Sequence, residues 1–396
     1  MNLLLLIGTY CDFGGTEKVV TLMANDLVES CPDCSVTIAA FRKECDPQKF
    51  GLSPKVLCVS LSGNGRSATC NLRQLLLDRK VDVIVNHWCL PFYVTRTINK
   101  ARKGLPIRLI SILEGVPDRC KKVIVAEDRV RAARGIGRLI AKVRLCALQF
   151  AVKASIRYVY RQSDRYLVIS KGFMESFRSY TGLKDLSRLD YIYPLTDFMD
   201  TGEVVLSNKK RQIVYVGRMD KENKRVNRIL AAWAAVANDH PDWSLVLVGG
   251  GPHLDELREE AVRHSIPRVT MTGFIQEAPS GYYRDSAIFM LTSDLEGFGL
   301  VLVEAMSYGV VPIVYNSYVT AREIVDDGVN GFLTPAPYSH ETTVDCLRRL
   351  MEDDSLRQRM ANAAVEKAKI FSQESIMEKW KVIIGRGDGR THSFSG

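Results

Sequence analysis

Long apolar runs are absent from this sequence of 396 residues, and none approaches the length needed to span a bilayer. The N-terminal apolar run at residues 3–7 is too short for the core of a signal peptide, and no basic segment precedes it. We therefore expect a cytoplasmic protein in which residues 3–7 belong to a first buried strand.

The sequence also lacks a complete set of ligands for a structural metal. Its ten cysteines lie mostly singly in apolar segments, where cysteine acts as a small hydrophobic residue. Cys31 and Cys34 have redox or zinc spacing, but no second pair completes a zinc site. Because this pair follows a helical pattern instead of opening one, the sequence favours a structural loop.

Acidic residues are scarce in one segment. The net charge of the chain is +9, and between Arg119 and Arg165 there are 13 Lys/Arg and 3 Asp/Glu. The local net charge is therefore +10, which leaves −1 for the rest of the chain. One segment makes the protein basic, and this indicates a local acidic partner.

Apolar runs alternate with helical patterns along both halves of the chain. The expected strands of the first half are residues 3–8, 36–41, 56–59, 83–86, 108–113 and 166–169, with helices at 16–29 and 66–77 among others. Those of the second half are residues 212–217, 244–249, 269–273, 287–291, 311–315 and 331–334, with helices such as 227–237 and 254–264. Such repeated units imply an α/β protein with a parallel, doubly wound sheet in each half.

A polar stretch near residues 194–210 marks the expected boundary between two domains, 1–195 and 196–371. Two such domains leave a cleft between the carboxyl ends of their strands, where sheets of this kind bind ligands. The glycine- and charge-rich tail at 386–396 is expected to be disordered.

The most informative motif begins at Glu296 and ends at Glu304. A strand is expected just before it, and a helical pattern begins near Leu300. One carboxylate therefore follows a strand, and the second lies about a turn into a helix. Gly297 and Gly299 allow a tight turn that exposes the free N–H groups of the helix start, which favour a phosphate. This arrangement suits a ligand with a central diphosphate and hydroxyls at both ends, such as a nucleotide-sugar.

Three glycine-containing turns agree with that motif. Gly217 and Arg218 end an expected strand, and Lys224 follows, so that two cations can hold a diphosphate and neutralise its charge as it leaves. A solvated arginine and lysine on a loop is the alternative. Gly14 and Gly15 form the first strand–helix turn, which can approach a phosphate, but the full Gly-x-Gly-x-x-Gly pattern is missing. In the third turn, residues 273–275 either hold a base through their backbone or form a plain loop.

These motifs resemble the GT-B glycosyltransferases, in particular the retaining group called family 4, which includes glycogen-synthase-like and bacterial polysaccharide transferases. The two glutamates separated by seven residues, the set of Gly217, Arg218 and Lys224, and the Gly14-Gly15 turn match that family's pattern in order. The resemblance covers nearly the whole chain and is strongest from Ile213 to Pro335.

The resemblance implies two Rossmann-like domains facing a central cleft. Residues 1–195 would bind the acceptor, residues 196–371 the nucleotide-sugar, and a helix at 372–385 would cross back to the first domain. Glu296 would contact the donor sugar and Glu304 the ribose, while Arg218 and Lys224 would hold the diphosphate. The other residues expected to bind the donor are Gly14, Gly15, Gly217, Gly273, Phe274, Ile275, Gly297, Phe298, Gly299 and Leu300.

The acceptor half departs from the family pattern. His87 follows an expected strand and resembles a family active-site histidine, although a structural histidine is equally compatible with the sequence. The family often has a His-Gly pair after the following strand, where this chain has Glu114 and Gly115. The departure implies either a different acceptor contact or altered chemistry.

The family usually works without a catalytic metal or other cofactor. This sequence has no Asp-x-Asp, the element that holds a cation on the diphosphate in the other main transferase fold. We therefore expect no metal site and a UDP-, GDP- or ADP-sugar as donor substrate. Retention of configuration is implied by the resemblance alone.

The basic segment is expected to form a long amphipathic helix over residues 129–161. Such a helix can lie on the inner leaflet of an anionic membrane, which would suit a lipid-diphosphate-linked acceptor. Equally, it can be a long domain helix with a solvated basic face. We expect no nucleic-acid partner, because the segment has neither interleaved aromatic residues nor a recognised binding motif.

Three functions remain in competition. The first is hexose transfer from a nucleotide-sugar to a glycan or lipid-linked glycan in the synthesis of a bacterial surface polysaccharide such as a capsule. The second is a nucleotide-sugar epimerase or hydrolase, for which Glu114 would be the supporting feature. The third is a non-catalytic, membrane-associated partner, which the complete set of Glu296, Glu304, Arg218 and Lys224 disfavours.

Overall fold

The structure is a computed structural model that describes residues 1–10, 15–41, 51–61, 65–196 and 209–385. The chain forms two compact units, and each is described by itself. Unit 1 is Met1–Leu195 together with the segment from Glu374, and unit 2 is Thr196–Gln373. Among the helices in the ranges described, none combines the length and apolar character needed to cross a membrane.

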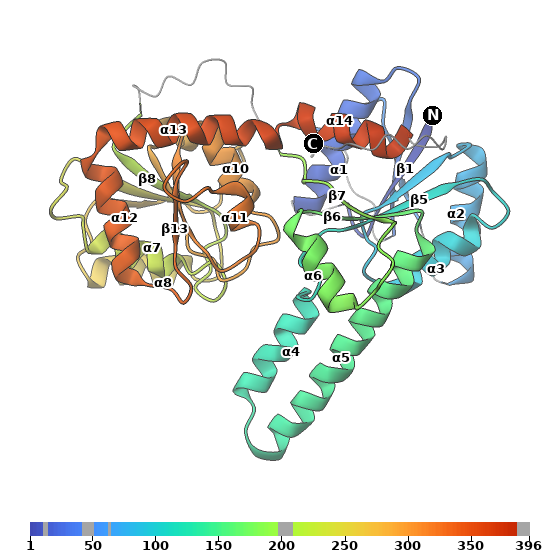
Figure 1. Ribbon diagram of the computed structural model, residues 1–396, viewed down its shortest axis with the longest axis horizontal. Coiled ribbons are helices and arrows are strands. Elements are labelled where there is room, and N and C mark those ends of the chain that lie inside the picture. Colours follow the sequence, from blue (N-terminus) through green and yellow to red (C-terminus); the bar gives the residue numbers. More distant parts are fainter. Residues whose placement is uncertain (11–14, 42–50, 62–64, 197–208, 386–396) are drawn as a thin grey trace. The chain divides into compact units, whose positions relative to one another are not determined.

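Unit 1 contains a parallel sheet of seven strands in the order β3-β2-β1-β4-β5-β6-β7 (Figure 1). The strands are β1 (Asn2–Ile7), β2 (Ser35–Ala40), β3 (Leu57–Ser60), β4 (Val83–Asn86), β5 (Arg108–Leu113), β6 (Arg165–Val168) and β7 (Leu189–Tyr191). Its shorter connecting helices are α1 (Gly15–Ser30), α2 (Arg66–Asp78), α3 (Phe92–Ala101) and α6 (Gly172–Thr181). The central strand β1 is almost wholly buried, which confirms the expectation for residues 3–7.

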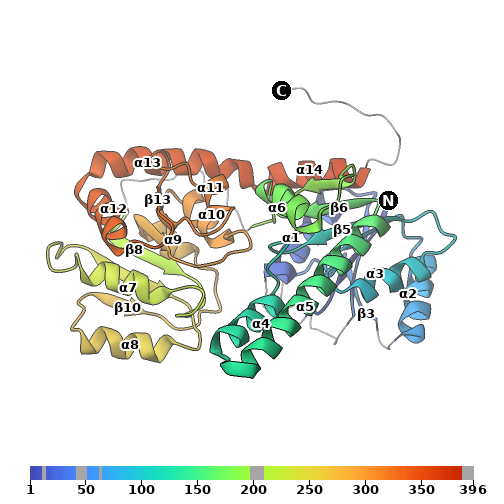
Figure 2. The ribbon, with the colours of Figure 1, turned by 60° about the horizontal axis from the view of Figure 1, so that its bottom comes forward.

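Unit 2 contains a second parallel sheet, in the order β10-β9-β8-β11-β12-β13. The strands are β8 (Gln212–Val216), β9 (Ser244–Val248), β10 (Val269–Met271), β11 (Ile288–Leu291), β12 (Val311–Tyr315) and β13 (Phe332–Thr334). The helices are α7 (Val226–Ala234), α8 (Leu254–Arg263), α9 (Ser280–Asp285), α10 (Leu300–Ser307), α11 (Ala321–Ile324), α12 (His340–Glu352) and α13 (Asp354–Ala368). Helices α7 and α8 pack side by side, and α10 packs against α13 (Figure 2).

Every strand expected from the sequence is present, with ends within two residues of those observed. The α/β fold with two parallel sheets is therefore confirmed. Strand β7 was not expected, because its three residues, Leu-Asp-Tyr, form too short an apolar run to stand out.

The last helix, α14 (Gln373–Gly385), belongs for nearly all its length to unit 1. The Arg108 guanidinium donates hydrogen bonds of 2.6 and 3.0 Å to the carbonyls of Ile384 and Ile383. Trp380 on this helix is fully buried. These contacts join α14 to the sheet of unit 1.

The expected single helix over residues 129–161 is wrong. The structure has α4 (Lys121–Ala132) and α5 (Gly135–Gln162), which pack against each other as a hairpin (Figure 1). Ala133 and Arg134 between them are extended, and Gly135 has a φ of 54°. Glycine adopts this left-handed backbone at little cost and is a poor helix former, so the chain reverses here.

Candidate active site

The two sheets share a feature that fixes where ligands bind. In each sheet, strands are added first on one side of the first strand and then on its other side. The direction reverses between β1 and β4 in unit 1 and between β8 and β11 in unit 2. Open parallel sheets bind ligands outside the carboxyl ends of the strands at such a switch point. In unit 2 the connection after β8 carries Arg218 and Lys224, and the connection after β11 carries Glu296.

Lys224 and Glu296 meet directly at the switch point of unit 2. The Lys224 ammonium donates to both carboxylate oxygens of Glu296, at 2.6 and 2.8 Å. Both side chains are largely removed from solvent. A cation and a carboxylate held together at a strand end can contact a phosphate and a sugar hydroxyl of one ligand.

Arg218 lies beside this pair in sequence but is more open, with 60% of its side chain exposed. Its guanidinium donates to Asp220 at 2.6 Å. Burial alone would raise the pKa of Asp220, but the backbone N–H groups of Asn223 and Glu222 and the charge of Arg218 lower it. Asp220 therefore stays ionised and closes the turn that carries both cations. Sequence reasoning gave Asp220 no such role. An aspartate whose carboxylate accepts hydrogen bonds from the backbone N–H groups two and three residues later is nevertheless a common turn signal.

A network of charges holds the two connections together. Asp294 accepts hydrogen bonds from Arg225 at 2.6 Å and from Arg228 at 2.7 Å. The Arg228 guanidinium also lies 5.0 Å from the ring centre of Tyr315 and 4.5 Å from that of Tyr338. Since Asp294 is two residues before Glu296, this network fixes the loop that presents the Glu296 carboxylate.

Glu304 lies in α10, buried, and accepts a hydrogen bond of 3.3 Å from the Tyr283 hydroxyl. Helix α10 begins at Leu300, as expected, after Gly299 with a φ of 94°. That left-handed conformation suits glycine and opens the first N–H groups of α10. Phe298 is buried, with its ring centre 5.6 Å from that of Phe371, so this residue contributes packing while Gly297 contributes only backbone.

Tyr318 is a candidate that sequence reasoning missed. Its hydroxyl is buried and makes no hydrogen bond in the part of the chain that the structure describes. A side chain at Gly299 would come within 3.9 Å of this oxygen. Burial first, and then the charge of Glu296, raise the pKa of Tyr318 well above its usual value. A protonated hydroxyl therefore lies near the start of α10, within the electrostatic influence of Glu296, yet a single tyrosine gives no signal in the sequence.

Glycines 249–251 were also missed, although three consecutive glycines at a strand end are a visible signal. Gly249 has a φ of 132°, and a Cβ there would collide with the carbonyl of Gly217. The backbone N–H of Gly217 donates to Val248 at 2.9 Å, and that of Gly249 donates to Gly273 at 3.2 Å. The carboxyl ends of β8, β9 and β10 are thus brought together by close backbone contact.

The loop of Gly273, Phe274 and Ile275 follows β10, which is the edge strand and lies three strands from β11. A Cβ at Gly250 would be 3.2 Å from that of Phe274, so the loop lies against the glycines after β9. The Phe274 ring is exposed.

In unit 1, His87 and Glu114 follow adjacent strands β4 and β5 and form a pair. His87 Nδ1 is 2.7 Å from the nearer carboxylate oxygen of Glu114, and the His87 side chain is completely buried. His87 Nε2 is buried and has no hydrogen-bond partner among the described residues. The Trp380 ring lies 6.4 Å away, centre to centre. Gly15 begins α1, whereas Gly14 lies outside the described residues.

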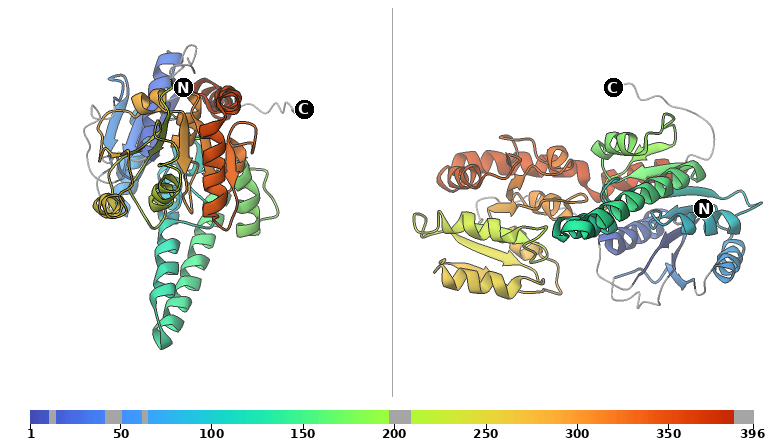
Figure 3. Two further views of the ribbon diagram at one scale, coloured as in Figure 1. Left: turned by 90° about the vertical axis from the view of Figure 1, so that its left-hand side faces the viewer. Right: turned by 90° about the horizontal axis from the view of Figure 1, so that it is seen from below.

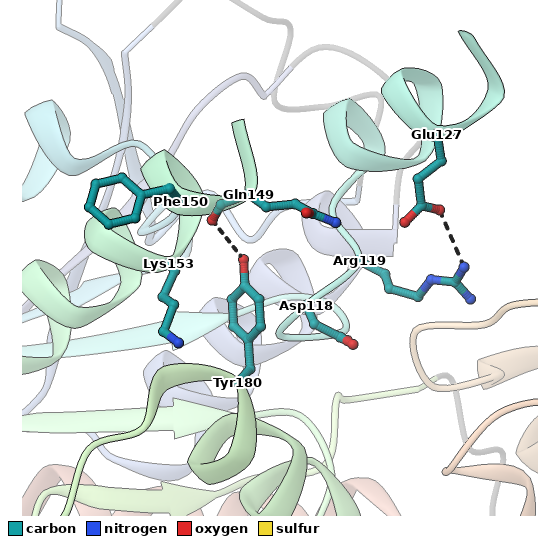
Figure 4. A pocket seen from close by; sticks show the side chains of 7 residues that line it. All are labelled: Asp118, Arg119, Glu127, Gln149, Phe150, Lys153 and Tyr180. Atoms are coloured by element: carbon teal, nitrogen blue, oxygen red, sulfur yellow. Dashed lines mark hydrogen bonds and ion pairs between the residues drawn. The ribbon is translucent and has the colours of Figure 1, made fainter. Parts of the chain in front are cut away.

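A separate pocket of about 360 Å³ lies in unit 1 where α4, α5 and α6 meet (Figure 4). Its lining residues are Asp118, Arg119, Glu127, Gln149, Phe150, Lys153 and Tyr180. It contains none of the residues expected in the site.

Comparison with solved structures defines the class of fold. The chain superposes on the lipopolysaccharide outer core galactosyltransferase WaaB in its apo form with a TM-score of 0.71 and 19% identity, over 98% of this chain and 100% of that one. Anabaena Alr3699/HepE, solved in complex with UDP and glucose, also gives 0.71, with 17% identity over 97% and 99% of the two chains. The chain therefore has the GT-B fold.

Sequence comparison finds relatives for part of the chain. Residues 200–367, less than half of the sequence, match the family described as glycosyl transferases group 1. The amylovoran biosynthesis glycosyltransferase AmsD of Erwinia amylovora is 25% identical over 236 residues, 59% of this chain and 66% of that protein. An N-acetylgalactosaminyltransferase of Campylobacter jejuni that acts on a diphospho-undecaprenol-linked sugar is 27% identical over 228 residues, 57% and 60% of the two proteins. The chain thus spans less than two thirds of the length of these relatives.

Proposed function

We propose that this protein is a retaining glycosyltransferase that moves a hexose from a nucleoside-diphosphate sugar to a glycan or lipid-linked glycan in bacterial surface polysaccharide synthesis. The observation that carries the proposal is the Lys224–Glu296 pair at the switch point of unit 2, with Arg218 on the same connection. The relatives support it, since AmsD is named for amylovoran biosynthesis and HepE was solved with UDP and glucose.

The donor roles follow from the chemistry at the strand ends. Arg218, Lys224 and the first N–H groups of α10 meet the charge that develops on the diphosphate as it leaves, so the reaction proceeds without a metal or other cofactor. Glu296 accepts hydrogen bonds from hydroxyls of the transferred sugar, and Glu304 accepts them from the ribose. Each carboxylate already has a protein donor beside it, which holds it in place for the ligand.

The acceptor is assigned to unit 1, at the carboxyl ends of β4 and β5. Glu114 is partly exposed, whereas His87 is sealed from solvent. We propose that Glu114 accepts a hydrogen bond from the acceptor hydroxyl and that His87 positions it through Nδ1. Glu114 and Gly115 stand where the family often has a His-Gly pair, and Glu114 gives the acceptor site a charged group.

Glu114 also supports a second candidate function, a nucleotide-sugar epimerase or hydrolase. Such an enzyme would consume the donor without an acceptor. A non-catalytic, membrane-associated partner remains the third candidate, and it would bind without turnover. Contact with the inner leaflet at the cytoplasmic face, which the sequence suggests for a helix over 129–161, is proposed for the α4–α5 hairpin.

The test is turnover of a panel of UDP-, GDP- and ADP-sugars with and without bacterial lipid-linked glycan extract. Release of nucleoside diphosphate that depends on the extract, with a product whose new anomeric linkage keeps the donor configuration by NMR, supports the proposal. Equal consumption without the extract favours the epimerase or hydrolase. Nucleotide binding without turnover of any donor favours the non-catalytic partner.

A further inference from the structure

The outer part of the α4–α5 hairpin is separate from the core of unit 1. The hairpin extends away from the sheet of its own unit (Figure 1 and the left panel of Figure 3). Not one residue from 133 to 150 is buried, and residues 134–140 are all exposed. This stretch therefore contributes little to the hydrophobic core.

An apolar stripe runs along this outer part of α5. It consists of Ile136, Leu139, Ile140, Val143 and Phe150, which recur at spacings of three, four and seven residues and so lie on one face of the helix. Ile136 is 79% exposed, Leu139 65% and Phe150 75%. A surface helix normally turns such a stripe toward its core, and here the stripe faces solvent instead.

The charge around the stripe has one sign. Residues 129–163 include nine Lys/Arg and no Asp or Glu. By helical position, Lys142 and Arg144 flank the stripe on its two sides. The nearest acidic residues, Glu127 and Asp128 on α4, are paired with Arg119 at 3.3 Å and Arg131 at 3.1 Å. The stripe thus lies among basic side chains, of which only Arg131 forms an ion pair within the described residues.

The inner part of α5 anchors the hairpin to the unit. Val152, Ile156 and Val159 are buried against the domain. The Tyr180 hydroxyl of α6 donates a hydrogen bond of 3.1 Å to the carbonyl of Gln149, next to Phe150 at the inner end of the exposed stripe (Figure 4). The stripe is therefore presented on a helix whose base is fixed.

We propose that the outer part of the α4–α5 hairpin docks on an anionic phospholipid surface. The apolar stripe enters the boundary between headgroups and acyl chains, and the flanking basic residues contact the lipid phosphates. An amphipathic basic helix with exposed apolar side chains has the composition of an interfacial helix. A second copy of the chain is disfavoured as the occupant, because two surfaces with nine basic residues each would repel. The proposal does not depend on what unit 2 binds.

Cosedimentation of the full-length protein with vesicles tests the proposal. One set of vesicles is phosphatidylcholine alone, and the other adds phosphatidylglycerol. We expect binding to the anionic vesicles that weakens as salt is added, and little binding to the neutral ones. Absence of binding to anionic vesicles at low salt would overturn the proposal.

Two variants separate the contributions of charge and apolar contact. Arg138→Gln/Lys142→Gln/Arg144→Gln should weaken vesicle binding by about two orders of magnitude, because each basic residue near such a surface contributes about fivefold (~1 kcal/mol). Ile136→Ser/Ile140→Ser should weaken it at least tenfold at high salt, where electrostatic attraction is screened. Both variants alter exposed residues only, so folding is preserved.

The matched control is Val262→Ser/Arg263→Gln on α8. Val262 is 79% exposed, the same as Ile136, and its helix carries four acidic residues, Asp255, Glu256, Glu259 and Glu260. This control should bind vesicles as the wild type does, and an equal loss in control and test variants would refute the assignment to the hairpin. A monomer–dimer equilibrium abolished by Ile136→Ser/Ile140→Ser would overturn the proposal in favour of a self-association surface. DNA is the last competitor to test. If DNA displaces the protein from the vesicles and both hairpin variants still bind DNA, the vesicle-binding surface lies outside the hairpin, which would also contradict the proposal.

Discussion

The two units have the same architecture but carry different chemistry at the carboxyl ends of their strands. In unit 2 the charged side chains at the switch point are paired and cross-linked, from Arg218–Asp220 to Lys224–Glu296 and the contacts of Asp294. In unit 1 the adjacent strands β4 and β5 are followed by His87 and Glu114, and His87 Nε2 has no protein partner among the described residues. A network built before the ligand arrives suits a diphosphate that every nucleotide-sugar shares. A single His87–Glu114 pair with a partly exposed carboxylate suits an acceptor that differs between enzymes.

The largest effect is expected from a substitution that breaks the network of ion pairs in unit 2. Glu296→Ala removes the carboxylate proposed to contact the sugar and leaves the Lys224 ammonium without its partner. The transfer rate should fall about a thousandfold or more, since one such contact to a developing charge is worth about two to three orders of magnitude. The transfer rate is measured as the initial rate of nucleoside diphosphate release.

Glu222→Ala is the matched control for Glu296→Ala, because it removes an exposed carboxylate from the connection that carries Lys224. It should leave the rate unchanged. Full activity in Glu296→Ala with normal folding by circular dichroism would show that the site is elsewhere.

A second, smaller loss is expected from Arg218→Ala. This change removes an exposed guanidinium that can form paired hydrogen bonds with a phosphate, and it should lower the transfer rate about a hundredfold. Arg218→Lys should restore only part of the activity, because an ammonium cannot make the same paired contact. Lys221→Ala is the control, since Lys221 is paired away from the site with Glu260 at 3.2 Å. An equal effect in both alanine variants would mean that general charge, not this position, matters.

The third prediction concerns unit 1. Glu114→Gln keeps a hydrogen-bond acceptor for His87 but loses the charge, so KM for the acceptor should rise about tenfold, the cost of one hydrogen bond to a charged group. Binding of nucleoside diphosphate, followed by calorimetry, should not change. Glu175→Gln on α6 is the control carboxylate of the same unit. Weakened nucleotide binding in Glu114→Gln would remove the difference between the two units.

The smallest effect is a pH dependence of the stability of unit 2. Burial lowers the pKa of Lys209 to about 7, although the charge of Asp285 opposes the shift, and the ammonium donates 2.7 Å to the carbonyl of Tyr283. The unfolded chain keeps this lysine protonated to about pH 10. Between pH 7 and 10 the unfolded state therefore binds more protons, and the free energy of unfolding should rise with pH by at most about 1.4 kcal/mol per pH unit.

Lys209→Met should flatten that rise, measured as the midpoint of urea unfolding at several pH values. Lys210→Met is the control, because Lys210 is exposed and paired with Asp285. An unchanged pH dependence in Lys209→Met would assign the effect to other groups.

Much of the fold was predictable because parallel strands buried on both faces form continuous apolar runs. The runs at residues 83–86, 108–113 and 311–315 were located to the residue. The break between α4 and α5 was not predicted. Basic and apolar residues continue through it, and glycine alone does not require a helix to end. The exposure of Ile136 and Phe150 could not be read either, since a stripe of the same spacing usually faces a core.

The candidate site was predictable where a motif lies within one connection, as it does for Glu296 to Leu300. It was not predictable where the contact joins residues far apart in sequence, as for His87 and Glu114. The packing of the loop at 273–275 against the glycines after β9 was also out of reach, because strand order in the sheet decides it. Sequence gives the ends of strands, whereas sheet order decides which ends are neighbours.

The most direct test of the central claim is thermal unfolding of the full-length protein with UDP, GDP and ADP, each with and without Mg²⁺. Ligand at 100 times its Kd should add about 2.7 kcal/mol to stability. We predict a saturable shift with one base, equal in both metal conditions and lost in Arg218→Ala. No shift with any nucleoside diphosphate, or an undiminished shift in Arg218→Ala, would contradict a diphosphate site at the β8–β11 switch point.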